Sequence, residues 1–403
     1  MKKDVQTQLE VLLRKAVHVI HQEELAERLR EGRPLRVKFG ADPSAPDLHL
    51  GHVVVLDKLR QFQEFGHTVV FLIGDFTARI GDPTGRSETR KPLSPEEVEA
   101  NAATYREQVF RILDPERTEV CFNRTWMEAM TAEELLRLCG QYTVARILER
   151  DDFSQRYREG RPIYLHEFLY PLLQAYDSVA VRADVEVGGT DQRFNLLVGR
   201  EIQKAYGQRP QIVLTLPLLE GTDGVQKMSK SLGNAIGITE PPDEMFGKVM
   251  SISDALMWRY YELLTDEDVP KLRERVDAGA LHPMEAKKEL AWKLVRRFWG
   301  SEAAEGARKR FEDHFQRGRI PEEHIVVRHV EAGRWQEISL PHELVSAGLV
   351  ASTSEAKRLI RQGAVRVEGT PHQDLVVRPG EGRHSVVVEV GKRRVLRLEK
   401  TPS

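Results

Sequence analysis

Apolar runs of strand length alternate with segments of helical periodicity through the first 240 residues. The apolar runs predict strands at residues 35–39, 68–73, 118–122 and 212–219, with a further short strand starting at Asp184. A continuous run such as 68–73 is typical of a strand that is buried on both faces of a sheet. The alternation therefore predicts an α/β fold, with a doubly wound parallel, Rossmann-like sheet in a domain over residues 1–240.

Helix signals support this order of elements. Residues 4–30 carry apolar side chains at helical spacing and predict one helix before the first strand. Ser94 precedes Pro95 and two glutamates, which is typical of an N-cap followed by a proline at the first helical position. Thr131 stands at the start of another predicted helix with an acidic first turn.

Strand patterns disappear after residue 240. Helical spacing over residues 245–250, 253–264, 283–300 and 301–315 predicts a helical domain at residues 241–325. A polar linker from Gly318 then leads to helical patterns at 340–348 and 354–363 and to strand patterns at 365–368 and 385–390. These patterns predict a small α+β domain at residues 331–403, and a chain of 403 residues is long enough for two or three domains.

Composition is informative mainly at the C-terminal end. The formal net charge is −2, but from Ala351 onward 11 Lys and Arg residues face 6 Asp and Glu residues, which favours a polyanion-binding module there. The two cysteines, Cys121 and Cys139, exclude a disulfide framework or a cysteine-rich zinc site. No apolar run is long enough to cross a membrane, and the first residues lack the apolar core of a signal peptide. We therefore expect a soluble, cytoplasmic protein with no membrane partner.

Two segments suggest chemistry on phosphates. His49-Leu-Gly-His52 follows a strand and a turn rich in Pro and Asp, at a helix start where free N–H groups and the helix dipole favour anions. The loop of residues 224–234 places Lys227 and Lys230 between glycines, where ammonium groups can stabilise charge on a leaving pyrophosphate. Taken singly, the first segment is equally well a capped helix with two surface histidines, and the second a solvated basic turn.

Two further polar groups follow helical spacing. Tyr170, Gln174 and Asp177 lie at i, i+4 and i+7 on one face of a predicted helix. That face is either a pocket wall or the solvated side of a half-buried helix. A basic cluster lies where the second C-terminal helix meets a turn, and it is either an RNA-binding surface or an ordinary solvated face. The cluster consists of Lys357, Arg358, Arg361 and Arg366.

The two phosphate segments together, read as HLGH and KMSKS, resemble the HIGH and KMSKS signatures of the class I aminoacyl-tRNA synthetases. Over essentially its whole length the chain is similar to the bacterial tyrosyl-tRNA synthetases of that class, as residues 81–86, 170–177 and 188–192 indicate. The C-terminal pattern resembles a small RNA-binding fold shared with a ribosomal small-subunit protein and some pseudouridine synthases. The resemblance implies activation of L-tyrosine with ATP to tyrosyl-adenylate and pyrophosphate, then transfer of the tyrosyl group to the 3′ end of tRNA(Tyr).

The resemblance also implies a role for each candidate residue. The substrate ammonium would be held by Asp82, Tyr170 and Gln174, the phenol by Asp177, and Gln192 would lie near the reacting carboxylate. The remaining residues would act on ATP. Ser44 and His49 would face the phosphates, His52 and Asp191 the ribose, Gly51 the base, Asp42 the adenylate, and Lys227 and Lys230 the pyrophosphate.

Partners follow from the same resemblance. Mg²⁺ is expected with ATP, bridging its phosphates, and no tightly bound protein-ligated metal is expected. A homodimer is expected, with its interface around residues 121–139 and the neighbouring helices. One position departs from the family. Lys38 stands where many bacterial members have a tyrosine, so a second contact to the phenol is missing or comes from another element.

Two alternative functions are considered. A tryptophanyl enzyme is built on the same catalytic fold, but Asp177 and the C-terminal module argue against it. A non-catalytic RNA-binding protein descended from a synthetase would have lost the signature histidines or the loop lysines. His49, His52, Lys227 and Lys230 are all present.

Overall fold

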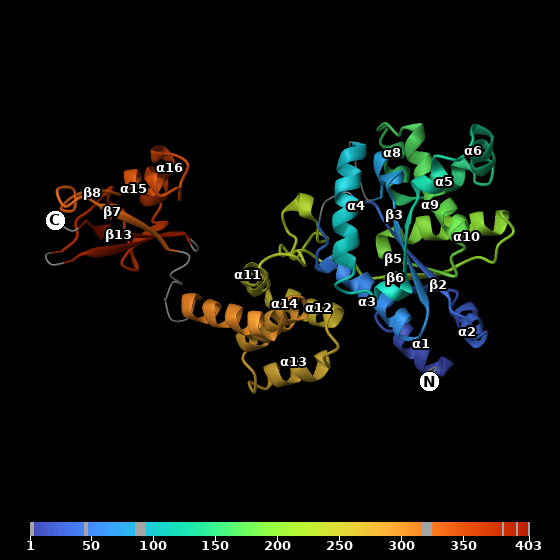
Figure 1. The fold of residues 1–403 in the computed structure, drawn as a ribbon, viewed down its shortest axis with the longest axis horizontal. Coiled ribbons are helices and arrows are strands. Elements are labelled where there is room, and N and C mark those ends of the chain that lie inside the picture. Colours follow the sequence, from blue (N-terminus) through green and yellow to red (C-terminus); the bar gives the residue numbers. More distant parts are fainter. Residues whose placement is uncertain are drawn as a thin grey trace. The chain divides into compact units, whose positions relative to one another are not determined.

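The computed structural model describes residues 4–43, 47–84, 94–315, 325–380, 383–391 and 394–401. The chain forms two compact units, Met1–Ala304 and Glu305–Ser403 (Figure 1). The first unit holds a six-stranded sheet, and the second a five-stranded sheet with two helices. In the described parts of the chain, no helix combines the length and hydropathy needed to cross a bilayer.

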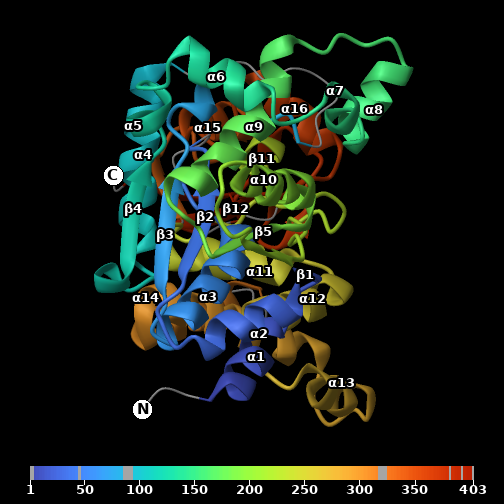
Figure 2. The same cartoon turned by 90° about the vertical axis from the view of Figure 1, so that its right-hand side faces the viewer.

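The sheet of the first unit confirms the predicted α/β fold. Its strand order is β1-β6-β5-β2-β3-β4, and every neighbouring pair is parallel except β1 with β6. Figure 2 shows β4, β3 and β2 side by side. The strands are β1 (His18–Ile20), β2 (Arg36–Ala41), β3 (Thr68–Ile73), β4 (Thr118–Phe122), β5 (Val185–Gly189) and β6 (Ile212–Leu216).

Helices lie on both faces of this sheet (Figure 1). Because helices cover both faces, the central strands carry apolar side chains on both sides. Strand β3, for example, is buried from its second residue onward. The main helices are α3 (Leu50–Glu64), α4 (Pro95–Val109), α6 (Ala132–Cys139), α9 (Leu165–Ala180) and α10 (Arg193–Ala205). Shorter ones are α5 (Arg124–Met127), α7 (Val144–Ile147), α8 (Asp151–Arg158), and the 3₁₀ turns η1 (Thr77–Arg79), η2 (Pro115–Arg117), η3 (Thr190–Gln192) and η4 (Lys230–Leu232).

The predicted N-caps are confirmed, but the prediction of a single helix over residues 4–30 is wrong. The Ser94 and Thr131 hydroxyls each accept a backbone N–H three residues on, in reciprocal capping boxes. Residues 4–30, however, form α1 (Val5–Leu13), β1 and α2 (Gln22–Arg30). The helix stops because Lys15 adopts a positive φ of 65° and residues 18–20 pair with β6. Long-range strand pairing overrides the local periodicity here.

The helical patterns after residue 240 are confirmed. The helices are α11 (Pro242–Ser251), α12 (Asp254–Leu264), α13 (Val269–Asp277) and α14 (Pro283–Phe315). Gly300 interrupts α14 with a φ of 85°, at the point where the two predicted segments meet. Helix α13 was not predicted, because Val269 is its only buried residue and the apolar stripe is correspondingly weak.

The second unit is a small α+β domain. Its five-stranded sheet has the order β10-β9-β12-β13-β7, and a two-stranded sheet joins β8 to β11. The predicted helices and the strands at β9 and β12 are confirmed, whereas β13 was missed and β7 lies in a segment that was predicted as linker. The elements are β7 (Ile325–Val330), β8 (Ile338–Ser339), α15 (Leu340–Ser346), α16 (Thr353–Arg361), β9 (Val365–Val367), β10 (Thr370–Pro371), β11 (Val376–Val377), β12 (Ser385–Val390) and β13 (Arg394–Lys400).

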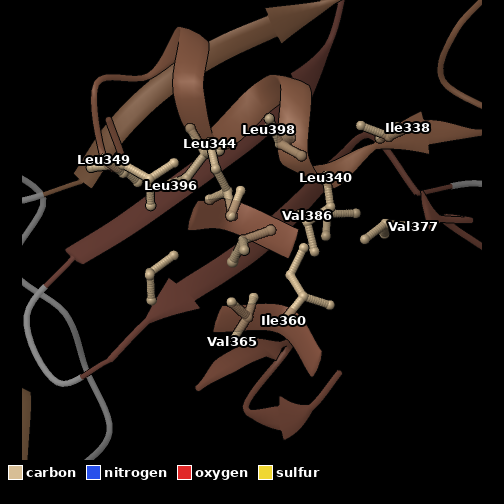
Figure 3. Close-up of a cluster of buried hydrophobic side chains, with 14 of the residues drawn as sticks. Ile338, Leu340, Leu344, Leu349, Ile360, Val365, Val377, Val386, Leu396 and Leu398 are labelled. Atoms are coloured by element: carbon tan, nitrogen blue, oxygen red, sulfur yellow. The ribbon is translucent and has the colours of Figure 1, made fainter. Parts of the chain in front are cut away.

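This unit has its own apolar core. Leu344 from α15 and Ile360 from α16 pack towards Leu396 of the sheet, and all three side chains are fully buried (Figure 3). The buried residues of this cluster all lie between Val330 and Leu398. The cluster therefore needs no side chain from the first unit to bury its apolar surface.

We expect Leu344→Ala to destabilise the second unit alone. Removing a fully buried leucine side chain should lower the free energy of unfolding of this unit by about 2–5 kcal/mol. Calorimetry should show the transition of this unit at lower temperature and the transition of the first unit unchanged. Val327→Ala, at a half-exposed site of the same sheet, is the control and should have little effect. Equal shifts of both transitions would contradict independent cores.

Candidate active site

A cavity of about 330 Å³ lies at the carboxyl ends of β2, β3, β5 and β6. Ligands bind at this edge in open parallel sheets, because the loops that leave the strands converge there. The structure brings almost all of the predicted catalytic, ATP and tyrosine residues to this one cavity. These are Asp42, His49, Gly51, His52, Asp82, Tyr170, Gln174, Asp177, Asp191, Gln192, Lys227 and Lys230. Ser44, the remaining candidate, lies outside the described residues.

The two histidines stand at the first turn of α3. Their ring centroids are 4.0 Å apart, and Nδ1 of His52 accepts the backbone N–H of His49 at 3.2 Å. Burial lowers the pKa of His49 to about 2 and that of His52 to about 4. Both imidazoles are therefore neutral at physiological pH. They can donate N–H hydrogen bonds to a ligand but bring no positive charge.

The positive charge on the opposite wall comes from the loop lysines. Nζ of Lys227 lies 2.8 Å from Asp191 Oδ2, and Lys230 forms an ion pair with Asp47. Asp47 lies two residues before His49, so the ion pair links the lysine loop to the segment that leads into the HLGH turn. A polyanionic ligand that enters the cavity has to replace these carboxylates as the partner of each ammonium group.

Gly51 is required by the close approach of the same two segments. A Cβ at this position would lie 3.0 Å from the His49 ring and 3.5 Å from the Cβ of Met228 in the lysine loop. Nδ1 of His49 is also buried without a hydrogen-bond partner among the described residues. A buried polar atom of this kind is usually satisfied in the functional state, so it suits an incoming polar ligand.

Polar side chains from several elements meet deeper in the cavity. The Tyr170 hydroxyl donates to Asp42 Oδ2 at 2.7 Å, and the Thr77 hydroxyl donates to Oδ1 of the same carboxylate at 2.7 Å. Burial, followed by the charge of Asp42, raises the pKa of Tyr170, so that its hydroxyl keeps its proton. Asp82 accepts a hydrogen bond from Gln192 Nε2 at 2.8 Å. These carboxylates make this part of the cavity suited to a cationic group.

Asp177 lies at the far end of the Tyr170 face of α9 and is only 1% exposed. Its two oxygens accept hydrogen bonds from Trp126 Nε1 at 2.8 Å and from Asn123 Nδ2 at 3.3 Å. Burial raises the pKa of Asp177 to about 7, against the opposing effect of the nearby Lys38 ammonium and of these two donors. A buried carboxylate with room on its cavity side is an acceptor for a hydroxyl.

Sequence reasoning missed the residues that hold this wall. Trp126 and Asn123 orient Asp177, and Nδ2 of Asn195 reaches both Gln174 Oε1 at 3.0 Å and Gln192 Oε1 at 3.2 Å. Asn123 follows β4 directly, so its place at a carboxyl strand end was a usable signal. Trp126 and Asn195 lie on helices and carried no comparable signal in the sequence.

The basic cluster lies in the second unit. Lys357, Arg358 and Arg361 are exposed on α16, while Ala356 and Ile360 of the same helix point into the core. Arg366 is exposed on β9. The structure therefore places the four cations at the surface. This exposure fits both an RNA-binding surface and an ordinary solvated face. Elsewhere, no group of three or more His, Cys, Asp or Glu side chains among the described residues is arranged to hold a metal ion.

Two family descriptions match this chain, one over the larger N-terminal part and one near the C-terminal end. Residues 30–316 match the family described as tRNA synthetases class I (W and Y), and residues 342–375 match the S4 domain. A tyrosine–tRNA ligase of Oleidesulfovibrio alaskensis is 54% identical over 398 residues, covering 98% of this chain and 99% of the relative. A tyrosine–tRNA ligase of Aquifex aeolicus is 53% identical over 398 residues, covering 97% and 98%.

Solved structures agree on the fold. A C-terminally truncated mitochondrial tyrosyl-tRNA synthetase of Coccidioides posadasii superposes with a TM-score of 0.61 at 25% identity, covering 76% of this chain and 92% of that one. The tyrosyl-tRNA synthetase of Archaeoglobus fulgidus, complexed with L-tyrosine, gives a TM-score of 0.62 at 24% identity, covering 76% and 100%. The family match covers most of the chain, and the curated relatives are similar along nearly all of it. The chain belongs to the class I tRNA synthetases of the tryptophan and tyrosine group.

Proposed function

We infer that this chain is a tyrosine–tRNA ligase. It activates L-tyrosine with ATP, releasing pyrophosphate, and then transfers the tyrosyl group from the adenylate to the 3′ end of tRNA(Tyr). The curated relatives at 53–54% identity carry this activity in their names. The observation that carries the inference is that the HLGH turn, the KMSKS loop and the Tyr170 face of α9 line the same cavity.

We propose that catalysis of the first step is mainly positioning and charge stabilisation. The tyrosine carboxylate attacks the α-phosphate, and negative charge grows on the departing pyrophosphate. Lys227 and Lys230 exchange their partners Asp191 and Asp47 for the phosphates. His49 and His52, being neutral, donate N–H hydrogen bonds to phosphate and ribose oxygens. Gly51 lines the cavity where the base would lie against the backbone, and its lack of a Cβ avoids the His49 ring and Met228.

Within the same proposal, opposite ends of the pocket hold opposite ends of the amino acid. Asp82, Tyr170 and Gln174 surround the ammonium group, with Asp42 as the hydrogen-bond partner of Tyr170. Gln192, which donates a hydrogen bond to Asp82, lies beside the reacting carboxylate of tyrosine. Asp177 accepts the hydrogen bond of the phenol.

Mg²⁺ enters in this scheme as the counter-ion of ATP. The two carboxylates that face the lysines, Asp47 and Asp191, are each engaged in an ion pair. Mg²⁺ would be held mainly by ATP itself, as is usual for nucleotide-bound magnesium, and would supply positive charge beside the phosphates.

We propose that the second unit binds tRNA(Tyr). The S4 match at residues 342–375 contains the four exposed cations of the basic cluster. Ammonium and guanidinium groups on an open surface contact mainly phosphates, so this binding should weaken steeply with salt. Residues 1–240, 241–325 and 331–403 then act as catalytic, helical and RNA-binding parts.

A homodimer is proposed because apolar side chains are exposed on α6 and at the start of α9. Leu136 is 72% and Leu165 is 81% exposed, and Val144, Tyr157 and Tyr164 are also exposed in the same stretch of chain. Apolar side chains in such number within one segment mark an association surface. Two-fold association is the commonest arrangement of soluble oligomers.

The proposed activity is tested by tyrosine-dependent exchange of pyrophosphate into ATP, with Lys230→Ala as the diagnostic variant. Wild type should exchange with tyrosine and not with tryptophan, which also excludes the non-catalytic alternative. Lys230→Ala should lower the rate of adenylate formation roughly 100- to 1,000-fold while tyrosine binding changes little, because Lys230 stabilises charge that grows only in the transition state. Lys271→Ala, at an exposed lysine on α13, is the control. An unchanged rate constant for Lys230→Ala would contradict its role.

Asp177→Ala should reduce discrimination between tyrosine and phenylalanine. Phenylalanine leaves a buried carboxylate without its hydroxyl partner, and this penalty disappears with the carboxylate. The ratio of kcat/KM for the two amino acids should fall about 5- to 150-fold, corresponding to the roughly 1–3 kcal/mol cost of an unsatisfied buried acceptor. Tyr176→Phe, whose ring packs on Tyr206, is the control on the same helix. A folded Asp177→Ala protein with the parental ratio would show that the phenol is recognised elsewhere.

Sedimentation at micromolar concentration tests the dimer. Wild type should sediment as a dimer, and the combination of Leu136→Glu and Leu165→Glu should produce monomers, because the new charges would be buried without partners in the interface. Met284→Glu, at an exposed apolar side chain of α14, is the control and should remain dimeric. A monomeric wild type would refute the proposal.

A further inference from the structure

A complete ion pair is buried behind the wall of the cavity. Nζ of Lys38 lies 2.8 Å from Glu186 Oε1, and the two side chains are 0% and 2% exposed. The residues are register partners on the adjacent parallel strands β2 and β5. Neither side chain lines the cavity. Lys38 is therefore not a substitute for the tyrosine that relatives place against the substrate phenol.

The pair is tied to helix α9 at two points that flank Asp177. Lys38 donates to the backbone carbonyl of Gln174 at 3.1 Å and to the hydroxyl of Ser178 at 2.8 Å. The Ser178 hydroxyl in turn donates to Glu186 Oε2 at 3.1 Å. One turn of α9, carrying both Gln174 and Asp177, is thus fastened to the sheet through the Lys38 ammonium and the Glu186 carboxylate.

The two charges act on Asp177 with opposite sign. Among the described residues, the charged groups with the largest effects on its carboxyl are Lys38 from β2 and Glu186 from β5, and the neutral phenol of Tyr170 lies on the same helix. The Lys38 ammonium lowers the pKa of Asp177, and the Glu186 carboxylate raises it to a smaller extent. Trp126 and Asn123 contribute neutral donors from the β4 side.

Stability alone gives little reason for a charged pair at this position. Desolvation offsets most of the attraction in a buried ion pair, and apolar residues of similar volume often serve as well. Its contacts with the Gln174–Ser178 turn point to a function in the neighbouring pocket.

We propose that Lys38 and Glu186 are positioning residues for substrate selection: together they hold the Gln174–Asp177 turn of α9 in place, and the Lys38 ammonium keeps the Asp177 carboxylate ionised to accept the phenol. This rests on the proposed function. The specificity of the pocket then depends on a pair of charges that the substrate does not touch.

The test is the pH profile of kcat/KM for tyrosine in pyrophosphate exchange, measured for variants of opposite charge. In wild type, kcat/KM should fall as the pH is lowered through neutrality, and this fall is the acid limb of the profile. The signature histidines cannot produce it because their pKa values are about 2 and 4. Lys38→Met removes the positive charge and should move the limb up by about one pH unit, with a roughly fivefold loss at the original midpoint. The preference for tyrosine over phenylalanine at pH 7 should fall in parallel.

Glu186→Gln should move the limb in the opposite direction, to lower pH, because Lys38 then acts on Asp177 without its counter-charge. Ser178→Ala is the matched control, since it removes a fully buried group of the same network without changing any charge, and it should leave the limb in place. A merely structural role predicts lower thermal stability for all three variants and no shift of the limb. If Lys38→Met does not fold, the downward shift of Glu186→Gln decides.

Shifts in the same direction for the two charge variants, a shift in Ser178→Ala equal to theirs, or a limb that does not move would overturn the inference. These outcomes leave the proposed function standing, because exchange still depends on tyrosine. Absence of tyrosine-dependent exchange in wild type would instead overturn the proposed function, and this inference with it.

Discussion

The parallel pairing of β2 with β3 and β5 is the constraint on which the rest of the site depends. Parallel strands end on one edge, so the HLGH turn after β2 and the Thr190–Gln192 turn after β5 are brought together although about 140 residues of chain separate them. The same register sets Lys38 directly opposite Glu186. A slip of one residue in either strand would point its charge to the other face of the sheet, away from its partner and from α9.

Burial then decides how each polar group behaves. The histidines of the first signature are neutral because they are buried, so the positive charge beside them comes from the side chains of the lysine loop. The opposite case is Asp177, whose pKa burial raises to about 7. Its ionised form depends on hydrogen-bond donors and on a nearby ammonium group. An ionised Asp177 is consequently maintained against a desolvation penalty.

Much of the fold could be predicted because the relevant signals are local. The apolar runs at β3 and β6 and the caps at Ser94 and Thr131 depend on residues only a few positions apart. Predictions were wrong where a distant partner decided the outcome. Residues 18–20 are a strand only because β6 offers an edge, and β7 becomes a strand by pairing with β13, some 70 residues later in the chain.

The sequence by itself determined the chemistry of the site, because two signatures and one helical face contain the reactive residue types in a recognisable order. It also determined that these groups belong at strand ends. Only the tertiary structure decided which groups meet. Trp126 and Asn123 donate hydrogen bonds to Asp177. Lys230 and Lys38 form ion pairs with Asp47 and Glu186, respectively. Such pairings join segments far apart in the chain. The charge states of these groups follow from the same pairings. Local sequence patterns do not encode the desolvation and distances that set those charges.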